Sequence, residues 1–260
     1  MRLLNVESMK LKTFTKNVPL YAILSHTWDA DQEVTFQMMQ GSDLGYQQLS
    51  GWAKIQDCCK QARSEGWKYV WVDTCCIDKT NSAELSEAIN SMFRWYKEAG
   101  TCYAYLSDIS GTFCFQSSRW FTRGWTLQEL IAPRFVFFFD QDWTPIGSRD
   151  SLLAEISLST GIRVDYLKGH DYFRKAPVSE IFYWASQRQT ERIEDEAYSL
   201  LGLFGIHMPL IYGEREMAFR RLQMAIIQER NDETIFAWLF GEIQDSGYAL
   251  DSHCKRGSGE

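Results

Sequence analysis

The fold of this chain is decided around one stretch of sequence, Arg119-Trp-Phe-Thr-Arg-Gly-Trp-Thr-Leu-Gln-Glu-Leu-Ile-Ala-Pro133. The pattern predicts a short helix, with Thr122 as its N-cap and Pro133 ending it two residues after the last large aliphatic position. Trp125 and Glu129 lie four residues apart and therefore share one edge of that helix. The aliphatic residues lie on the opposite edge, so we expect the helix to dock through them. Trp125 and Glu129 should then face outward or into a cleft.

An aromatic plane beside a carboxylate, held on a rigid element, suits a flat, positively charged ring that is bonded to a sugar. The alternative is structural: Glu129 is solvated next to a half-buried Trp125, because most charged residues at helical spacing simply face water. Spacing alone favours the structural interpretation, so the rest of the sequence has to decide between the two.

The composition is that of a globular protein with a large core. Of 260 residues, 45% are hydrophobic and 15% are aromatic, which is enough for one core or for a core with an appended subdomain. The formal net charge is −7 and no stripe of lysine and arginine is present, which argues against a nucleic-acid partner. The longest apolar runs, such as residues 135–139, are far too short to span a bilayer.

Two features of the sequence bear on the cellular compartment. The N-terminal residues turn polar quickly, so no secretory signal is expected. The seven cysteines are an odd number, and four of them form the adjacent pairs Cys58-Cys59 and Cys75-Cys76. Adjacent cysteines rarely bridge one another and do not build a disulfide framework. We therefore expect a reducing compartment and a cytoplasmic protein.

Strand and helix patterns alternate through the first half of the chain. Asn81 is expected to cap one of the helices, with Glu84 completing a capping-box-like start. Alternation of this kind predicts an α/β fold with a mostly parallel sheet that is flanked by helices. Strand patterns lie at residues 21–25, 67–73, 102–107 and 134–139, and helical patterns at residues 52–66 and 81–96.

The second half carries mostly helical patterns, and no linker rich in proline, serine or glycine separates it from the first. We therefore predict an α/β core over residues 1–140 and a mainly helical extension, packed on the core, over residues 141–240. Residues 241–260 are expected to be a tail or a truncated linker. The acidic run Glu194-Asp-Glu196 is expected to mark a helix N-terminus. The helical patterns lie at residues 149–160, 178–188, 194–204 and 214–229, and a final strand pattern at 234–238.

Polar residues gather where the predicted strands end. The first three strands end in Ser25-His-Thr-Trp28, Asp73-Thr-Cys-Cys76 and Ser107-Asp108, and the helix that carries Glu129 follows the third. In open parallel sheets, ligands bind outside the carboxyl ends of the strands. This convergence predicts a ligand site at that edge of the sheet, and it is a stronger argument than any single motif.

Other chemistries are weaker candidates. The cysteines do not form paired C-x-x-C motifs and the four histidines are scattered, so no metal site is expected. A cysteine nucleophile would place Cys75 or Cys76 near His26, although a buried cysteine is usually a small hydrophobe. The sequence contains no G-x-S-x-G elbow, no P-loop and no G-x-G-x-x-G motif.

Seven blocks of the sequence carry a family resemblance: Tyr21–Trp28, Tyr69–Asp78, Ser86–Tyr96, Cys102–Asp108, Arg119–Leu130, Glu194–Phe204 and Met208–Gly213. In order, they cover nearly the whole chain and resemble the HET (heterokaryon incompatibility) domain of filamentous fungi and the segment that follows it. The resemblance implies a non-self recognition module whose activation triggers cell death. In many relatives it is the effector of a larger receptor with a nucleotide-binding oligomerisation domain and repeats, so self-association into oligomers is also implied.

The HET core also looks like a divergent TIR domain, which implies a TIR-like, flavodoxin-like sheet. In TIR domains that hydrolyse NAD, the working Glu lies on a short helix in a W-x-x-x-E arrangement, and Trp125-Thr-Leu-Gln-Glu129 matches that spacing. Ser25, His26 and Asp73 would occupy the places where TIR domains hold the nicotinamide ribose. The loop sequences are not TIR-like, and the helical extension is foreign to the simple TIR fold. These departures bear on the identity of the substrate more than on the fold.

This second resemblance implies NAD or a related nucleotide as the substrate, with no metal and no further cofactor. Glu129 would stabilise the positive charge that develops on the sugar as the nicotinamide–ribose bond breaks. Trp28, Trp125 or both would stack on the nicotinamide ring, and Arg123 would neutralise part of the pyrophosphate charge. Cys75, at a predicted strand end, completes the expected substrate-binding set.

A rival hypothesis is a non-enzymatic module that kills by assembling or by recruiting a partner. Trp125 and Glu129 would then be packing or interface residues, and the many aromatic residues would supply interface anchors. Nicotinamide release that depends on Glu129 would favour the enzyme, whereas toxicity that survives its replacement by glutamine would favour the module.

Overall fold

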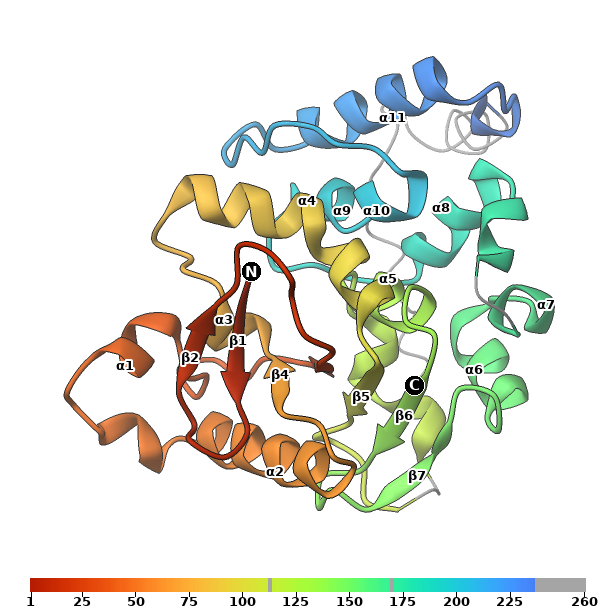
Figure 1. The fold of residues 1–260 in the computed structure, drawn as a ribbon. Coiled ribbons are helices and arrows are strands. Elements are labelled where there is room, and N and C mark those ends of the chain that lie inside the picture. The colour runs from red at the N-terminus through yellow and green to blue at the C-terminus, as the bar shows by residue number, and fades with distance from the viewer. Residues whose placement is uncertain (112–113, 169–170, 237–260) are drawn as a thin grey trace, which may run out of the picture.

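The computed structural model describes residues 1–111, 114–168 and 171–236, and a seven-stranded mixed sheet forms its centre (Figure 1). The strand order across the sheet is β2-β1-β4-β3-β5-β6-β7. The strands are β1 (Arg2–Asn5), β2 (Leu11–Thr13), β3 (Ala22–His26), β4 (Tyr69–Trp71), β5 (Thr101–Tyr105), β6 (Val136–Phe139) and β7 (Pro145–Ser148). The prediction of an α/β fold is confirmed.

The four central strands, β4, β3, β5 and β6, are parallel, as the alternation of patterns predicts. Antiparallel strands flank them, with β1 and β2 at one edge and β7 at the other. Neither β2 nor β7 has a buried residue, so neither shows the apolar alternation by which a strand is recognised. This is why the sequence patterns did not indicate them. The β7 strand also lies beyond residue 140, so the second half of the chain contributes one strand to the sheet.

Helices cover both faces of the sheet. The right-handed crossover through α2 runs from β3 to β4, whereas those through α4 and α5 run in the opposite direction and so cover the opposite face. Figure 1 shows α2 on one side of the strands and α4 with α5 on the other. The helical elements of this half are α1 (Phe36–Gln40), η1 (Gly45–Gln48), α2 (Ser50–Ser64), α3 (Asp73–Cys76), α4 (Ser82–Glu98), η2 (Phe115–Ser117), η3 (Arg119–Thr122) and α5 (Thr126–Ile131).

The start of α4 confirms one half of the predicted capping box. The side chain of Asn81 accepts hydrogen bonds from the backbone N–H groups of Ala83 and Glu84, at 3.1 and 3.2 Å. Glu84 does not return a bond to Asn81, because its carboxylate binds the guanidinium of Arg2 at 2.5 Å and the N–H of Asp78 at 2.8 Å. The nearby β1 strand thus supplies a charged partner that a local pattern cannot include.

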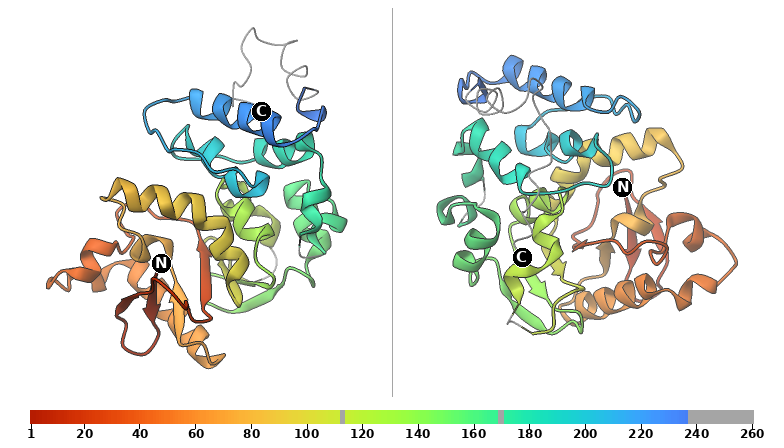
Figure 2. Two further views of the ribbon diagram at one scale, coloured as in Figure 1. Left: turned by 45° about the horizontal axis from the view of Figure 1, so that its top comes forward. Right: turned by 180° about the vertical axis from the view of Figure 1, so that it is seen from behind.

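The second half of the chain forms a helical layer beside the core (Figure 2). Here α10 packs closely on α4, since a Cβ on Gly202 would lie 2.0 Å from the Cβ of Phe93. The predicted strand at 234–238 is wrong within the described residues: 234–236 are helical, and 237–238 lie outside them, as does the tail. The elements are α6 (Leu153–Thr160), α7 (Val164–Leu167), η4 (Tyr172–Lys175), α8 (Val178–Ser186), α9 (Asp195–Tyr198), α10 (Leu201–Phe204) and α11 (Met217–Glu229).

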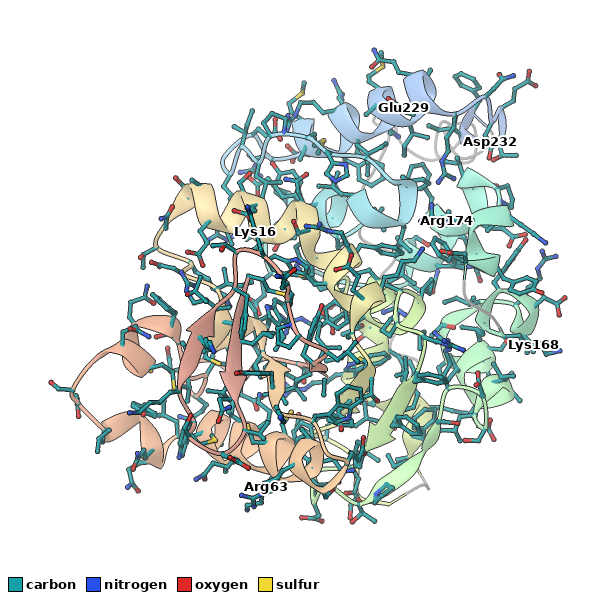
Figure 3. The ribbon with its side chains drawn as sticks, viewed as in Figure 1. Lys16, Arg63, Lys168, Arg174, Glu229 and Asp232 are labelled. Atoms are coloured by element: carbon teal, nitrogen blue, oxygen red, sulfur yellow. The ribbon has the colours of Figure 1, made fainter. Side chains whose placement is uncertain are left out.

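Large aromatic side chains fill the interior, and most charged ones lie nearer the surface. Trp71, Trp120 and Trp184 are each at most 1% exposed. In Figure 3, by contrast, the labelled side chains of Arg63 and Lys168 lie at the edge of the molecule, and both are exposed. This separation is the expected result of removing apolar area from water.

The segment around α5 differs from expectation in two respects. Thr122 is not an N-cap but the last residue of η3, where its hydroxyl donates to the carbonyl oxygen of Arg119 at 2.9 Å. The helix begins only at Thr126, and every one of its six residues is buried. It therefore has no outward edge. The cause is tertiary, because the helix packs on β3 and α4 and the Glu129 carboxylate bonds to Ser25 of β3. Arg188 and Gln189 of the extension bond to residues 122–126, just before the helix and at its first residue.

Candidate functional site

Glu129 lies inside the protein at the carboxyl end of β3. Its Oε2 accepts a hydrogen bond of 2.5 Å from Ser25 Oγ, which in turn accepts one of 2.8 Å from Trp120 Nε1. Glu129 is only 5% exposed and Ser25 is fully buried. The structure thus brings the predicted carboxylate to the predicted strand-end serine, but it does so below the surface.

The pKa of Glu129 follows from this burial. Desolvation of the carboxylate and the nearby charge of Asp73 raise the pKa to about 8, against the hydrogen bonds of Ser25 and Tyr96 and the charge of Arg123, which lower it. At pH 7 the group is therefore mainly protonated. A carboxyl with a raised pKa at the end of parallel strands is typical of functional sites, although structural networks also produce such values.

Two more predicted residues, His26 and Asp73, form a pair at the ends of β3 and β4. His26 Nε2 lies 2.9 Å from Asp73 Oδ1, and Trp28 Nε1 donates to Asp73 Oδ2 at 3.0 Å. Asp73 begins the single turn of α3, where a loop was expected. Burial alone would raise the pKa of Asp73, but the charge and hydrogen bond of His26, together with Lys79 and Arg123, hold it well below its usual value.

His26 is held as a neutral, oriented base. Burial first, and the charge of Lys54 second, lower its pKa. Because Asp73 can only accept, Nε2 carries the proton and Nδ1 is the free acceptor. Nδ1 has no hydrogen-bond partner among the described residues, with Glu33 Oε1 at 3.9 Å and committed to Lys54 at 2.6 Å.

A hollow of about 300 Å³ opens next to these groups. Ligand pockets span about 300–1,000 Å³, so this one is at the small end of the range. Three of the predicted site residues, Trp28, Arg123 and Trp125, line the hollow. The other predicted site residues are not part of its lining. The site is therefore divided into a surface hollow and a buried polar cluster behind it.

The extension supplies one wall of the hollow. The N–H of Gln189 donates to the carbonyl oxygen of Thr122 at 2.7 Å, and its carbonyl oxygen accepts from Gly124 at 2.8 Å. A side chain at Gly124 would meet Thr190, since a Cβ there would lie 2.5 Å from Thr190 Cγ2. The absence of a side chain at residue 124 therefore lets the extension approach the start of α5.

Sequence reasoning missed seven residues of the lining. Asp195 was expected only to mark a helix N-terminus, whereas its Oδ2 accepts from Trp125 Nε1 at 3.3 Å and holds the indole. Its place in an acidic run was the one available signal, because the other contacts join segments far apart in the sequence. The missed residues are Thr27, Arg119, Thr122, Gln189, Thr190, Glu191 and Asp195.

Arg188 is a further residue that the sequence did not single out. It is 9% exposed, and its Nη1 donates to the carbonyl oxygen of Arg123 at 2.9 Å and to Thr126 Oγ1 at 2.8 Å. Its Nη2 has no hydrogen-bond partner in the described part of the chain. Burial lowers the pKa of Arg188 to about 9, while the charge of Glu129 raises it. A buried arginine of the extension thus acts on the same helix as the candidate carboxylate.

Cys75 lies apart from the lining of the hollow. It is fully buried, and the hydrogen bond with Cys76, together with burial, raises the pKa of its thiol well above the usual value. Its binding role stays a prediction. Across residues 1–111, 114–168 and 171–236, no three His, Cys, Asp or Glu side chains gather as a metal site would require. Within the same residues, no helix is both long and apolar enough to cross a membrane.

The fold and the site together define a class: an α/β domain with a polar cluster at the ends of its parallel strands and a helical extension beside it. Comparison with known proteins finds one matching protein family and one similar protein. Residues 21–113 match the family described as Heterokaryon incompatibility protein (HET). The chain is also similar to the vegetative incompatibility protein HET-E-1 of Podospora anserina, with 48% identity over 226 residues.

These two findings support a heterokaryon incompatibility domain in this chain, as the sequence blocks imply. The aligned region covers 80% of this chain but 16% of HET-E-1, so the chain spans only a small part of that relative. No solved structure matches the chain. The TIR-like assignment therefore stays a prediction.

Proposed function

We propose that this chain is an effector domain of heterokaryon incompatibility, which triggers cell death when non-self recognition brings it into an oligomer. The family match and the similarity to a protein named for vegetative incompatibility support this role. Because the chain spans 16% of that relative, the proposal places it within a longer, cytoplasmic receptor. A nucleotide-binding oligomerisation domain and repeats would supply the trigger there.

The proposed activity is hydrolysis of NAD at the nicotinamide–ribose bond by a TIR-like sheet. The position of Glu129 carries this proposal: it bonds to Ser25 at the end of β3, one helical turn from Trp125 on the wall of the hollow. The order of the parallel strands, β4-β3-β5-β6, turns round between β3 and β5, where open α/β sheets bind ligands. Trp28 and Arg123 add an aromatic plane and a cation to the same wall.

In the proposed step, the bond between nicotinamide and ribose breaks and its electron pair neutralises the positive ring nitrogen. The positive charge passes to the sugar, where ionised Glu129 stabilises it. Water then adds to the sugar carbon and releases a proton to solvent. With a pKa of about 8, Glu129 is ionised in only a minor fraction of molecules at pH 7. The approach of a positively charged ring favours its ionisation.

The burial of Glu129 adds a conformational requirement to the proposal. The residue is 5% exposed and does not line the hollow, so a nucleotide held there does not touch the carboxylate. Assembly would therefore open the floor of the hollow toward Ser25 and Glu129. An effector that is toxic when active is expected to be closed as a monomer, and a small population shift then suffices to switch it.

The alternative is a non-enzymatic module that signals by assembly, and one observation favours it. The buried bonds from Trp120 to Ser25 and from Ser25 to Glu129 are what a purely structural network would contain. An interface is also available, because Met217 and Met224 on α11 are 49% and 57% exposed. In that case the carboxylate would hold α5 on β3 and would never meet a substrate.

The test is to replace Glu129 with glutamine, which keeps the shape and removes the charge. The whole chain, fused to an oligomer-forming domain, is incubated with NAD, and free nicotinamide is measured. Loss of a group that stabilises transition-state charge should lower the rate about 100-fold or more. Glu229→Gln, at the exposed end of α11, is the matched control and should not change the rate. An unchanged rate in Glu129→Gln would exclude the assignment, and toxicity that persists without nicotinamide release would favour the module.

A further inference from the structure

Two cations lie against Trp28, a residue that lines the hollow. The Nζ of Lys79 is 3.5 Å from the centroid of the indole ring, and the Cζ of Arg123 is 4.7 Å from it. Both lie within the distance of about 6 Å at which a cation is attracted to an aromatic face. The ring itself is held in place, because its Nε1 donates to Asp73.

Neither cation has a strong anionic partner. In the described parts of the chain, no hydrogen bond or ion pair within 4.0 Å joins Lys79 to a carboxylate, and Arg123 reaches Glu191 only at 4.0 Å. Asp73 is close enough to act on both charges, but its two oxygens are already bonded to His26 and Trp28. Lys79 does not itself line the hollow, and the lining also contains Glu191 and Asp195. The incompletely neutralised positive charge is therefore that of the two cations on Trp28, Lys79 behind the wall and Arg123 in it.

Arg119, which lines the hollow beside Arg123, differs from these two cations because it has an anionic partner. Its guanidinium is paired with Asp29 and donates to Ser107 Oγ at 3.0 Å. Burial lowers the pKa of Lys79, because desolvation disfavours its charged form. A bound anion would stabilise that charged form. Lysine also has a flexible stem, which lets its ammonium group move between neighbouring partners.

We propose that Lys79 is a phosphate-binding residue that acts with Arg123, and that it leaves the face of Trp28 when a flat cationic ring stacks there. The proposal deepens the proposed function and rests on it for the identity of the ligand, a dinucleotide with one cationic ring. Such a ring needs an aromatic face that Lys79 now occupies. The pyrophosphate of the same ligand carries two negative charges, and the displaced lysine and Arg123 supply two positive ones.

Binding measurements separate this inference from catalysis. Each ligand is titrated by calorimetry into the whole chain, fused to the oligomer-forming domain and carrying Glu129→Gln so that no turnover occurs. ADP-ribose presents the pyrophosphate without the ring, and nicotinamide riboside presents the ring without phosphate. Lys79→Met keeps the stem and removes the charge, Lys79→Arg restores a charge, and Lys16→Met, at an exposed position labelled in Figure 3, is the control.

We expect Lys79→Met to weaken ADP-ribose binding about tenfold or more, as for the loss of a charge-assisted hydrogen bond. Nicotinamide riboside should bind as tightly or more tightly, because its ring no longer competes with an ammonium group on Trp28. Lys79→Arg should recover most of the affinity for ADP-ribose. A change below twofold in Lys79→Met, or no ADP-ribose binding by the reference protein, would overturn the inference. If ADP-ribose binding depends on Lys79 but the active chain releases no nicotinamide, the binding site stands and the proposed hydrolysis fails.

Discussion

The buried carboxyl of Glu129 should make the stability of the protein fall as the pH rises through neutrality. Glutamine at this position keeps the size of the side chain but does not titrate. The comparison of Glu129→Gln with the parent chain therefore isolates the protonation of one group. Other titrating residues, including His26 with its lowered pKa, are present in both proteins and cancel in the difference.

The size of the effect follows from the two pKa values. In the unfolded chain the carboxyl titrates near its ordinary value of 4.5, and in the folded chain at about 8. Between about pH 5.5 and 7.5 the folded state thus holds nearly one more proton than the unfolded state, which corresponds to about 1.4 kcal/mol per pH unit. Since the folded pKa is raised, this stabilisation is complete below the unfolded pKa and is lost as the pH rises through about 8. Over two pH units, the parent should lose roughly 3 kcal/mol relative to Glu129→Gln.

Urea unfolding at pH 5.5, 6.5 and 7.5, followed by tryptophan fluorescence, measures this difference. A constant offset between the two proteins would reflect the altered bond to Ser25, so the slope with pH is the informative quantity. Glu229→Gln, an exposed change on α11, should give a curve parallel to that of the parent. If Glu129→Gln also ran parallel to the parent, the carboxyl would be titrating as a solvated group, and the buried position of Glu129 would be refuted.

Three further predictions follow. If ionised Glu129 is the working form, nicotinamide release should rise with pH up to about 8, and a rate that is flat from pH 6 to 8 would contradict that role. Ser25→Ala should cost about 1–3 kcal/mol in urea unfolding, because Trp120 Nε1 and the carboxyl each lose a buried partner, and unchanged stability would mean that water replaces the hydroxyl. Gly202→Ala should cost about 1–3 kcal/mol in the same assay through overpacking on Phe93, and a neutral result would show that α10 can shift away from α4.

The sequence by itself determined the parallel core and the positions of its strand ends. Apolar runs and helical spacing depend on near neighbours in the chain, so the alternation could be read before any packing was known. Ser25, His26 and Asp73 could be placed at one edge of the sheet for the same reason, since the carboxyl ends of parallel strands meet there. The W-x-x-x-E spacing likewise predicted one helix for Trp125 and Glu129, and the structure has Glu129 on α5 with Trp125 at the N-cap just before it.

Only the tertiary structure decided which of these side chains face water. The helix of Glu129 looked two-sided in the sequence, but the edge that carries Glu129 packs on β3 and α4, where the carboxylate bonds to Ser25, 104 residues earlier in the chain. The extension also forms one wall of the hollow, where Asp195 accepts a hydrogen bond from Trp125. The exposure of a side chain, and with it the pKa of a carboxyl, is set by whatever packs against it, and segments that pack together are not marked by local spacing. For this reason the residue types of the site could be read from the sequence, whereas the separation of its carboxylate from its hollow could not.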